Sequence, residues 1–182
     1  MKIMSGLFLL LVYFFSVPVW AEADISTDEV LEIIRQDAKS AFGDMREDIY
    51  LPNVKVSSAL VELIGPSIAG KPENFGNYIM VYGCRVQSCT EKAVAIVDGA
   101  KKRIAAVGLI NFRCGRKQAR DSAGKVKSMG FCEKNAVLNT YVLVGDDEVA
   151  GKADLELLVK KIHQWAAMHY YEGEVFRRIK RR

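Results

Sequence analysis

Apolar residues recur at helical spacing near both ends of the chain. Ser26 and Glu29 have the spacing of a capping box, and the amphipathic pattern after them predicts a helix over about residues 27–46. A second pattern of this kind predicts a C-terminal helix. One face of that helix would carry five residues: Leu155, Leu158, Ile162, Trp165 and Met168.

Four apolar segments between these helices have the composition of β-strands. They cover residues 78–82, 93–97, 103–112 and 136–144. Asp98-Gly99 is a hairpin dipeptide, so the second and third segments are expected to pair. This order predicts an α+β fold, with a central antiparallel β-sheet flanked by an N-terminal and a C-terminal helix. Residues 53–76 have no decisive pattern, and residues 113–135 are expected to form a surface excursion.

Residues 1–21 have the organisation of a secretory signal peptide, with a positive start, an apolar run and the small residue Ala21 before the cleavage point. Cleavage after Ala23 also satisfies the small-residue rule. The apolar run, residues 6–15, is too short for a membrane core that needs about 20 residues, so no stable membrane anchor is expected. We therefore predict a periplasmic protein with a single domain over residues 22–182.

Composition and charge exclude several other classes of protein. The chain has 182 residues, 50% of them hydrophobic, which excludes a disordered or low-complexity chain. Its formal net charge of +4 is too weak and too dispersed to predict nucleic-acid binding. Residues 177–182 form a basic tail, which is typical of a solvated, frayed end; contact with anionic lipid is the alternative.

The four cysteines are Cys84, Cys89, Cys114 and Cys132. An even number of cysteines in an oxidising compartment favours disulfides. Of the three connectivities, the spacing favours the two local pairs, Cys84–Cys89 and Cys114–Cys132. A zinc site is the alternative, although the spacing fits common zinc motifs poorly.

The search for catalytic chemistry yields little. The chain has none of the common motifs for a nucleophilic serine, a zinc protease, a phosphate loop or a dinucleotide fold. His163 and His169 are six residues apart, so on one helix they would point to different faces. We therefore expect a non-enzymatic protein without a metal or another cofactor.

The loop Cys84-Arg85-Val86-Gln87-Ser88-Cys89 is the most specific feature, because it joins two strongly apolar segments. A disulfide here would fix the shape of four exposed side chains at a strand tip, which lowers the ordering cost of binding. Arg85 adds donors suited to carboxylates. The alternatives are a hairpin staple without a ligand and, with poorer spacing, a redox pair.

Several stretches resemble, in order, the periplasmic inhibitors of vertebrate (C-type) lysozyme. Residues 41–45 and Leu51-Pro52 are similar to the first helix of that family and its exit. Residues 78–89 are similar to its strand and disulfide-closed inhibitory loop, and residues 92–109 to the hairpin that follows. The resemblance covers about residues 25–112.

The resemblance implies a central antiparallel sheet flanked by helices, in a family that is often dimeric, so a homodimer is allowed. It also implies inhibition by insertion of loop 84–89 into the cleft of a lysozyme or a related peptidoglycan-cleaving enzyme, a role in bacterial defence. The family's Lys-Pro-His-Asp loop interior is Arg85-Val86-Gln87-Ser88 here. The alternative is an interaction or immunity module with a different secreted target.

Overall fold

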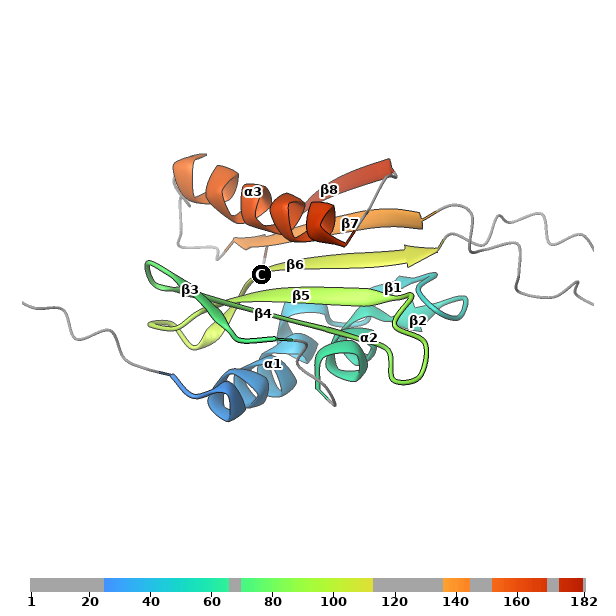
Figure 1. Ribbon diagram of the computed structural model, residues 1–182, viewed down its shortest axis with the longest axis horizontal. Helices are drawn as coiled ribbons and strands as arrows, with labels where there is room; N and C mark the ends of the chain where they lie inside the picture. The colour runs from blue at the N-terminus through green and yellow to red at the C-terminus, as the bar shows by residue number, and fades with distance from the viewer. Residues whose placement is uncertain (1–24, 66–69, 113–135, 145–151, 170–173, 182) are drawn as a thin grey trace, which may run out of the picture.

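The computed structural model describes residues 25–65, 70–112, 136–144, 152–169 and 174–181. They form a six-stranded sheet with helices on both faces, and a separate two-stranded sheet, β1–β2 (Figure 1). The strand order in the large sheet is β3-β4-β5-β6-β7-β8. The strands are β1 (Arg46–Glu47), β2 (Val54–Lys55), β3 (Glu73–Phe75), β4 (Tyr78–Cys84), β5 (Lys92–Asp98), β6 (Arg103–Phe112), β7 (Ala136–Val144) and β8 (Glu174–Arg181).

Strands β3 to β7 are antiparallel neighbours, which confirms the predicted α+β fold with a central antiparallel sheet. Strand β8 is the exception, because it lies parallel to β7 and pairs with it from Val137 to Val144. The prediction of a frayed tail over residues 177–182 is therefore wrong for residues 177–181, and residue 182 lies outside the described residues. The backbone of this segment pairs with β7, and an edge strand tolerates a run of charged residues.

Helix α1 (Thr27–Phe42) begins as the sequence predicts, since the Ser26 hydroxyl accepts a hydrogen bond from the Glu29 N–H at 3.2 Å. The helix ends earlier than residue 46. Gly43 adopts a φ of 55°, which ends the helix, and its N–H donates to the Lys39 carbonyl. The chain then turns into β1.

Helix α2 (Val56–Ile64) lies in the stretch that had no decisive pattern. Its apolar residues face the same side of the sheet as those of α1. Together the two helices cover one face of the sheet, while α3 (Lys152–Met168) covers the other (Figure 1). Within the described residues, no helix has both the length and the apolar character that crossing a membrane requires.

Helix α3 buries three of its five predicted residues, Leu158, Ile162 and Trp165, while Leu155 is half-buried. Met168 is 64% exposed, so its predicted place on the same apolar face is wrong. At about 100° per residue, position 168 is turned about 120° away from Ile162. Val159 and Ala166 complete the buried face instead.

A glycine permits the close approach of α3 to the sheet. A Cβ at Gly108 would lie 2.6 Å from Ile162 Cγ2 and 2.9 Å from Val94 Cγ1. The sheet is buried on both faces here, and its central strands β5 and β6 are almost continuously apolar. The centre of the sheet is therefore buried between the two helical layers, and the strands reach solvent at their end connections.

Candidate functional site: the disulfide-closed loop

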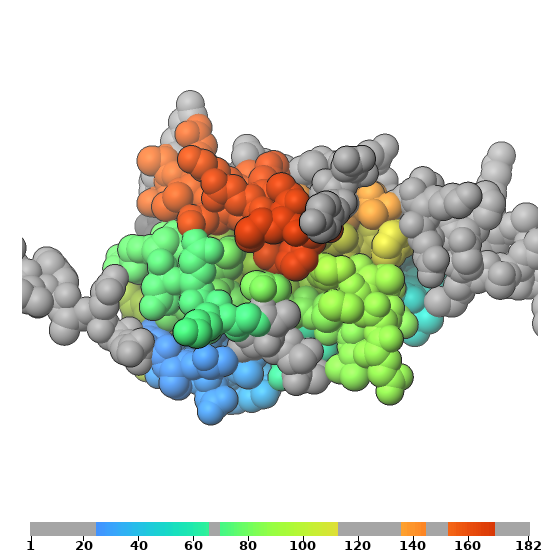
Figure 2. All heavy atoms as spheres, in the orientation of Figure 1, coloured from blue at the N-terminus to red at the C-terminus, as the bar shows by residue number. Residues whose placement is uncertain are grey.

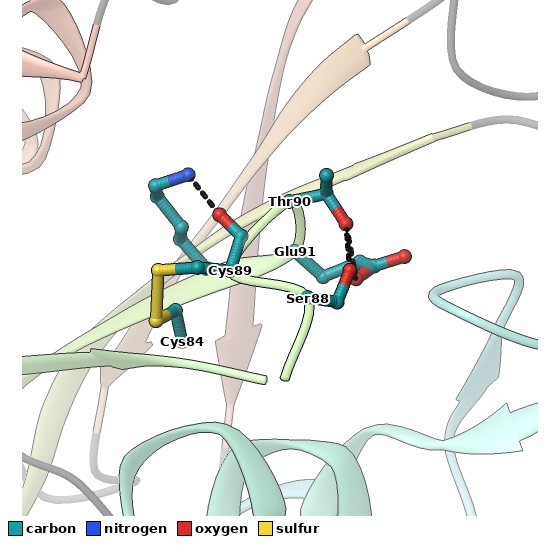
Figure 3. The surroundings of a disulfide bond; sticks show 6 residues. Cys84, Ser88, Cys89, Thr90 and Glu91 are labelled. Carbon is teal, nitrogen blue, oxygen red and sulfur yellow. Dashed lines mark hydrogen bonds between the residues drawn. A yellow bond between two sulfur atoms is a disulfide. The ribbon is translucent and has the colours of Figure 1, made fainter. Parts of the chain in front are cut away.

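The connection between β4 and β5 projects from the body of the protein (Figures 1 and 2). A disulfide joins Cys84, the last residue of β4, to Cys89, with the Cα atoms 4.8 Å apart (Figure 3). This confirms the predicted local pairing of these two cysteines. Cys114 and Cys132 lie outside the described residues.

The backbone inside the ring forms a tight turn. The N–H groups of Ser88 and Cys89 both donate to the Arg85 carbonyl, at 3.2 and 3.0 Å. Gln87 and Cys89 have positive φ values of 70° and 46°. Lys92, the first residue of β5, donates a hydrogen bond from its ammonium group to the Cys89 carbonyl. The loop is therefore fixed by backbone bonds as well as by the covalent link.

The four interior side chains are not equally accessible. Val86 is 54% exposed, and Gln87 is also exposed at the tip of the turn. Arg85 and Ser88 are half-buried. The prediction of four exposed side chains is therefore right for Val86 and Gln87 and wrong for the other two, which turn back toward the protein.

Arg85 is held by two neighbours. Its guanidinium lies 3.7 Å from a carboxylate oxygen of Glu91, whose side chain is only 11% exposed. Its Cζ atom lies 5.5 Å from the centre of the Tyr50 ring, within the range of a cation–π contact. A largely buried carboxylate needs such a partner. Arg85 thus fixes the base of the loop, and its guanidinium faces the protein's own Glu91.

Hydroxyl groups complete the environment of Glu91. The Thr90 hydroxyl donates to the carboxylate at 2.8 Å, and the Ser88 hydroxyl lies 3.5 Å from the same oxygen (Figure 3). Ser88 and Thr90 are also hydrogen-bonded to each other. These contacts explain why Ser88 points inward.

Tyr50 connects the loop to helix α2. Its hydroxyl donates to the Glu62 carboxylate, and its ring lies beneath Arg85. Burial, reinforced by this hydrogen bond, raises the pKa of Tyr50 to about 12, so the phenol remains a donor at neutral pH. Sequence reasoning missed this contact because Tyr50 and Arg85 are distant in the chain and no local pattern links them.

The two histidines have different surroundings. His163 is exposed on α3, whereas His169 follows the end of that helix and contacts the rings of Tyr82 and Trp165, with centroids 5.4 and 5.2 Å away. Burial, together with the positive charge of Lys92, lowers the pKa of His169 below its usual range. His169 therefore belongs to the aromatic packing near the base of the loop.

Two surface hollows offer little for acid–base chemistry. One, of about 490 Å³, lies between α1 and α2, and its lining includes Arg35, Lys39, Lys55 and the single carboxylate Glu62. The other, of similar volume, lies along α3 with Glu156 as its single carboxylate. Neither brings together the two carboxyl groups that glycoside hydrolysis generally requires.

Comparison with known proteins assigns the chain to no family, so its function has to be inferred from the structure. No protein-family model matches the chain, and no curated protein matches it. The described residues place a disulfide-closed loop between β4 and β5 that exposes one apolar side chain, Val86, and one neutral amide, Gln87.

Proposed function

We propose that the protein is an exported, non-enzymatic inhibitor of a lysozyme or a related peptidoglycan-cleaving enzyme. In this proposal, loop 84–89 enters the substrate cleft of that enzyme and blocks it. The observation that carries the proposal is the disulfide-closed loop that exposes Val86 and Gln87 at its tip while its base is fixed. The resemblance to C-type lysozyme inhibitors also supports loop 84–89 as the inhibitory loop.

The physical argument rests on the rigidity of the loop. Immobilising a flexible side chain at an interface costs about 0.5–1.5 kcal/mol, and a loop that is ordered beforehand avoids part of that cost. Cleaving enzymes of this class generally carry a pair of carboxyl groups at the scissile bond. The Gln87 amide can donate hydrogen bonds to a carboxylate, and Val86 can be buried against the cleft wall.

The proposal is tested by titrating the mature protein, residues 22–182, into a C-type lysozyme and into a lytic transglycosylase acting on cell-wall substrate. We expect saturable inhibition of at least one enzyme, weakened about tenfold or more by the pair Val86→Ala and Gln87→Ala. The matched control pair is Leu157→Ala and Met168→Ala, which truncates two exposed apolar side chains on α3 and should inhibit normally. No inhibition of either enzyme at large molar excess would refute the proposal.

A second candidate is an interaction or immunity module that has the same fold, a secreted target different from a lysozyme or a related peptidoglycan-cleaving enzyme, and no inhibition of C-type lysozyme. The observation that favours it is the ion pair between Arg85 and Glu91. Because the guanidinium is paired with a carboxylate of the protein itself, it is less available for the catalytic carboxylates of a lysozyme. The same titration separates the two candidates. Inhibition of the transglycosylase but not of C-type lysozyme would support the first proposal with a different enzyme, whereas inhibition of neither would leave the second.

A further inference from the structure

A second loop, residues 48–53 between β1 and β2, lies at the same end of the sheet as loop 84–89 (Figure 1). The two loops are in direct contact, because the Arg85 guanidinium packs over the Tyr50 ring. Residues from two distant parts of the chain therefore meet at one end of the molecule. A partner that reaches the base of loop 84–89 would therefore lie close to residues 48–53.

Loop 48–53 is internally ordered. The Asp48 carboxylate accepts a hydrogen bond from the Asn53 N–H at 3.0 Å, and the Leu51 carbonyl accepts one from the Ile49 N–H at 3.2 Å. Arg46 donates to the Asn53 carbonyl at 2.7 Å. Asn53 has a φ of 62°, a conformation that asparagine tolerates better than most residues. These bonds hold the turn in one shape without a disulfide.

Buried polar groups anchor this loop to the sheet. The Asn111 side-chain amide on β6 donates to the Asp48 carbonyl at 2.5 Å, and the Asn139 amide on β7 donates to Asn111 Oδ1 at 2.7 Å. Asn111 and Asn139 are 1% and 4% exposed. Ile49, at 3% exposed, adds an apolar anchor. The position of the loop is therefore set by the rigid centre of the fold.

Leu51 is the large apolar residue that loop 48–53 exposes, next to the exposed Pro52 and Asn53. It is 52% exposed, although it follows the buried Ile49 and the half-buried Tyr50. Among the residues whose burial the structure describes, which leaves out β8, four large apolar side chains are exposed: Leu51, Val86, Leu157 and Met168. Two of these, Leu51 and Val86, stand on the two neighbouring loops. The loops that carry them touch through Arg85 and Tyr50, so a partner that reaches one of these side chains could also contact the other.

We propose that Leu51 forms a second part of the binding surface and packs against an apolar rim of the cleft that loop 84–89 enters. This inference rests on the proposed function and adds a second contact region to it. Loop 84–89 supplies the polar donor Gln87 and the apolar Val86, whereas loop 48–53 supplies an apolar anchor. Tyr50 and Arg85 keep the two parts in a fixed relation.

The test is the inhibition constant of Leu51→Asp against an enzyme that the wild-type protein inhibits. We expect inhibition to weaken about tenfold or more, because a charge would replace the apolar contact. The matched control is Leu157→Asp, which introduces the same charge at an exposed leucine on α3 and should leave inhibition unchanged. Leu51→Ala should show a smaller loss of about threefold to tenfold, and thermal melting of each variant reports whether the fold is retained.

Each outcome decides the inference. If the wild-type protein inhibits and Leu51→Asp inhibits equally well, the second contact region is wrong and the proposed function stands. If the wild-type protein inhibits no peptidoglycan-cleaving enzyme, the proposed function fails and this inference fails with it. If light scattering shows that Leu51→Asp dissociates a dimer while inhibition is unchanged, Leu51 serves self-association and the inference is overturned.

Discussion

Strand β5 ends in two connections that are built differently. At one end, loop 84–89 is closed by a disulfide and exposes Val86 and Gln87. At the other end, the turn between Asp98 and Arg103 is closed by hydrogen bonds. The Asp98 carboxylate, in a residue only 7% exposed, accepts the Lys101 N–H at 3.0 Å, and the Gly99 N–H donates to the Asn77 carbonyl at 2.9 Å.

The second turn is also docked against the N-terminal helix. The Ile104 N–H donates to the Asp37 carboxylate of α1 at 2.7 Å, and Lys102 forms an ion pair with Glu29 at 3.0 Å. A Cβ at Gly99 would lie 2.9 Å from the Ile25 side chain. This turn is shaped by its neighbours, whereas the projecting loop carries its own covalent constraint. The contrast indicates that the loop is built to keep its shape outside the body of the protein.

The largest expected effect comes from removing the covalent constraint with Cys84→Ser and Cys89→Ser. Several side chains would then have to be ordered on binding, so we expect inhibition to weaken about 100-fold. The free energy of unfolding should fall by about 2 kcal/mol, because the disulfide closes a short ring. Enzyme inhibition and denaturant titration measure the two quantities. Unchanged inhibition in a folded variant would show that the disulfide is only a staple.

The corresponding change in the other turn is Asp98→Ala. It leaves the Lys101 N–H without its acceptor, so we expect the free energy of unfolding to fall by about 1–3 kcal/mol. Inhibition at a temperature where the variant is folded should match that of the wild-type protein. Asp98→Asn, which keeps an acceptor oxygen, serves as the control and should lose less stability. A strong loss of inhibition in folded Asp98→Ala would show that this turn also contributes to inhibition, and would contradict the functional difference between the two connections.

A smaller effect is expected from Glu91→Gln. This change removes the ionic partner of Arg85 but keeps an oxygen for the hydroxyls of Ser88 and Thr90. We expect inhibition to weaken about threefold to tenfold, since the base of the loop loosens, with a loss of about 1–3 kcal/mol in the free energy of unfolding. If inhibition improves instead, the released Arg85 would contact the partner directly.

The smallest effect is a pH dependence of stability from His169. Its folded-state pKa is lowered by burial and by Lys92, so the unfolded chain takes up a proton near pH 6.5 while the folded chain does so only at lower pH. Protonation of His169 therefore does not affect the free energy of unfolding well above pH 6.5. Below that pH the free energy of unfolding declines as the pH falls toward 5. Denaturant titrations at pH 7.5 and pH 5 should show a smaller decline in His169→Asn. An equal decline in both proteins would assign the effect to other groups.

Local signals predicted those elements whose causes are local. The capping of α1 by Ser26 and the buried stripe of α3 follow from side-chain spacing, as do the apolar strands β4 to β7. Strand β8 was missed because its pairing depends on how α3 returns the chain to β7. The charge of this segment carried no information about that backbone partner.

The candidate site was predictable to a similar extent. Cysteine spacing was enough to predict the pair Cys84–Cys89. Which loop residues face solvent depended on Tyr50 and Glu91, whose contacts with Arg85 arise from tertiary packing. Helix α2 and the anchoring of loop 48–53 by Asn111 also depend on contacts between distant residues. Because of the contacts around Arg85 and Ser88, only Val86 and Gln87 of the four residues predicted to be exposed are exposed.

The central claim, that loop 84–89 occupies a substrate cleft, is tested most directly by competition. Binding of residues 22–182 to an enzyme that they inhibit is measured by calorimetry with increasing concentrations of an oligosaccharide of N-acetylglucosamine that fills the cleft. The account predicts that the apparent Kd rises in proportion to the oligosaccharide concentration once the cleft is saturated. An apparent Kd that stays constant in saturating oligosaccharide would contradict it.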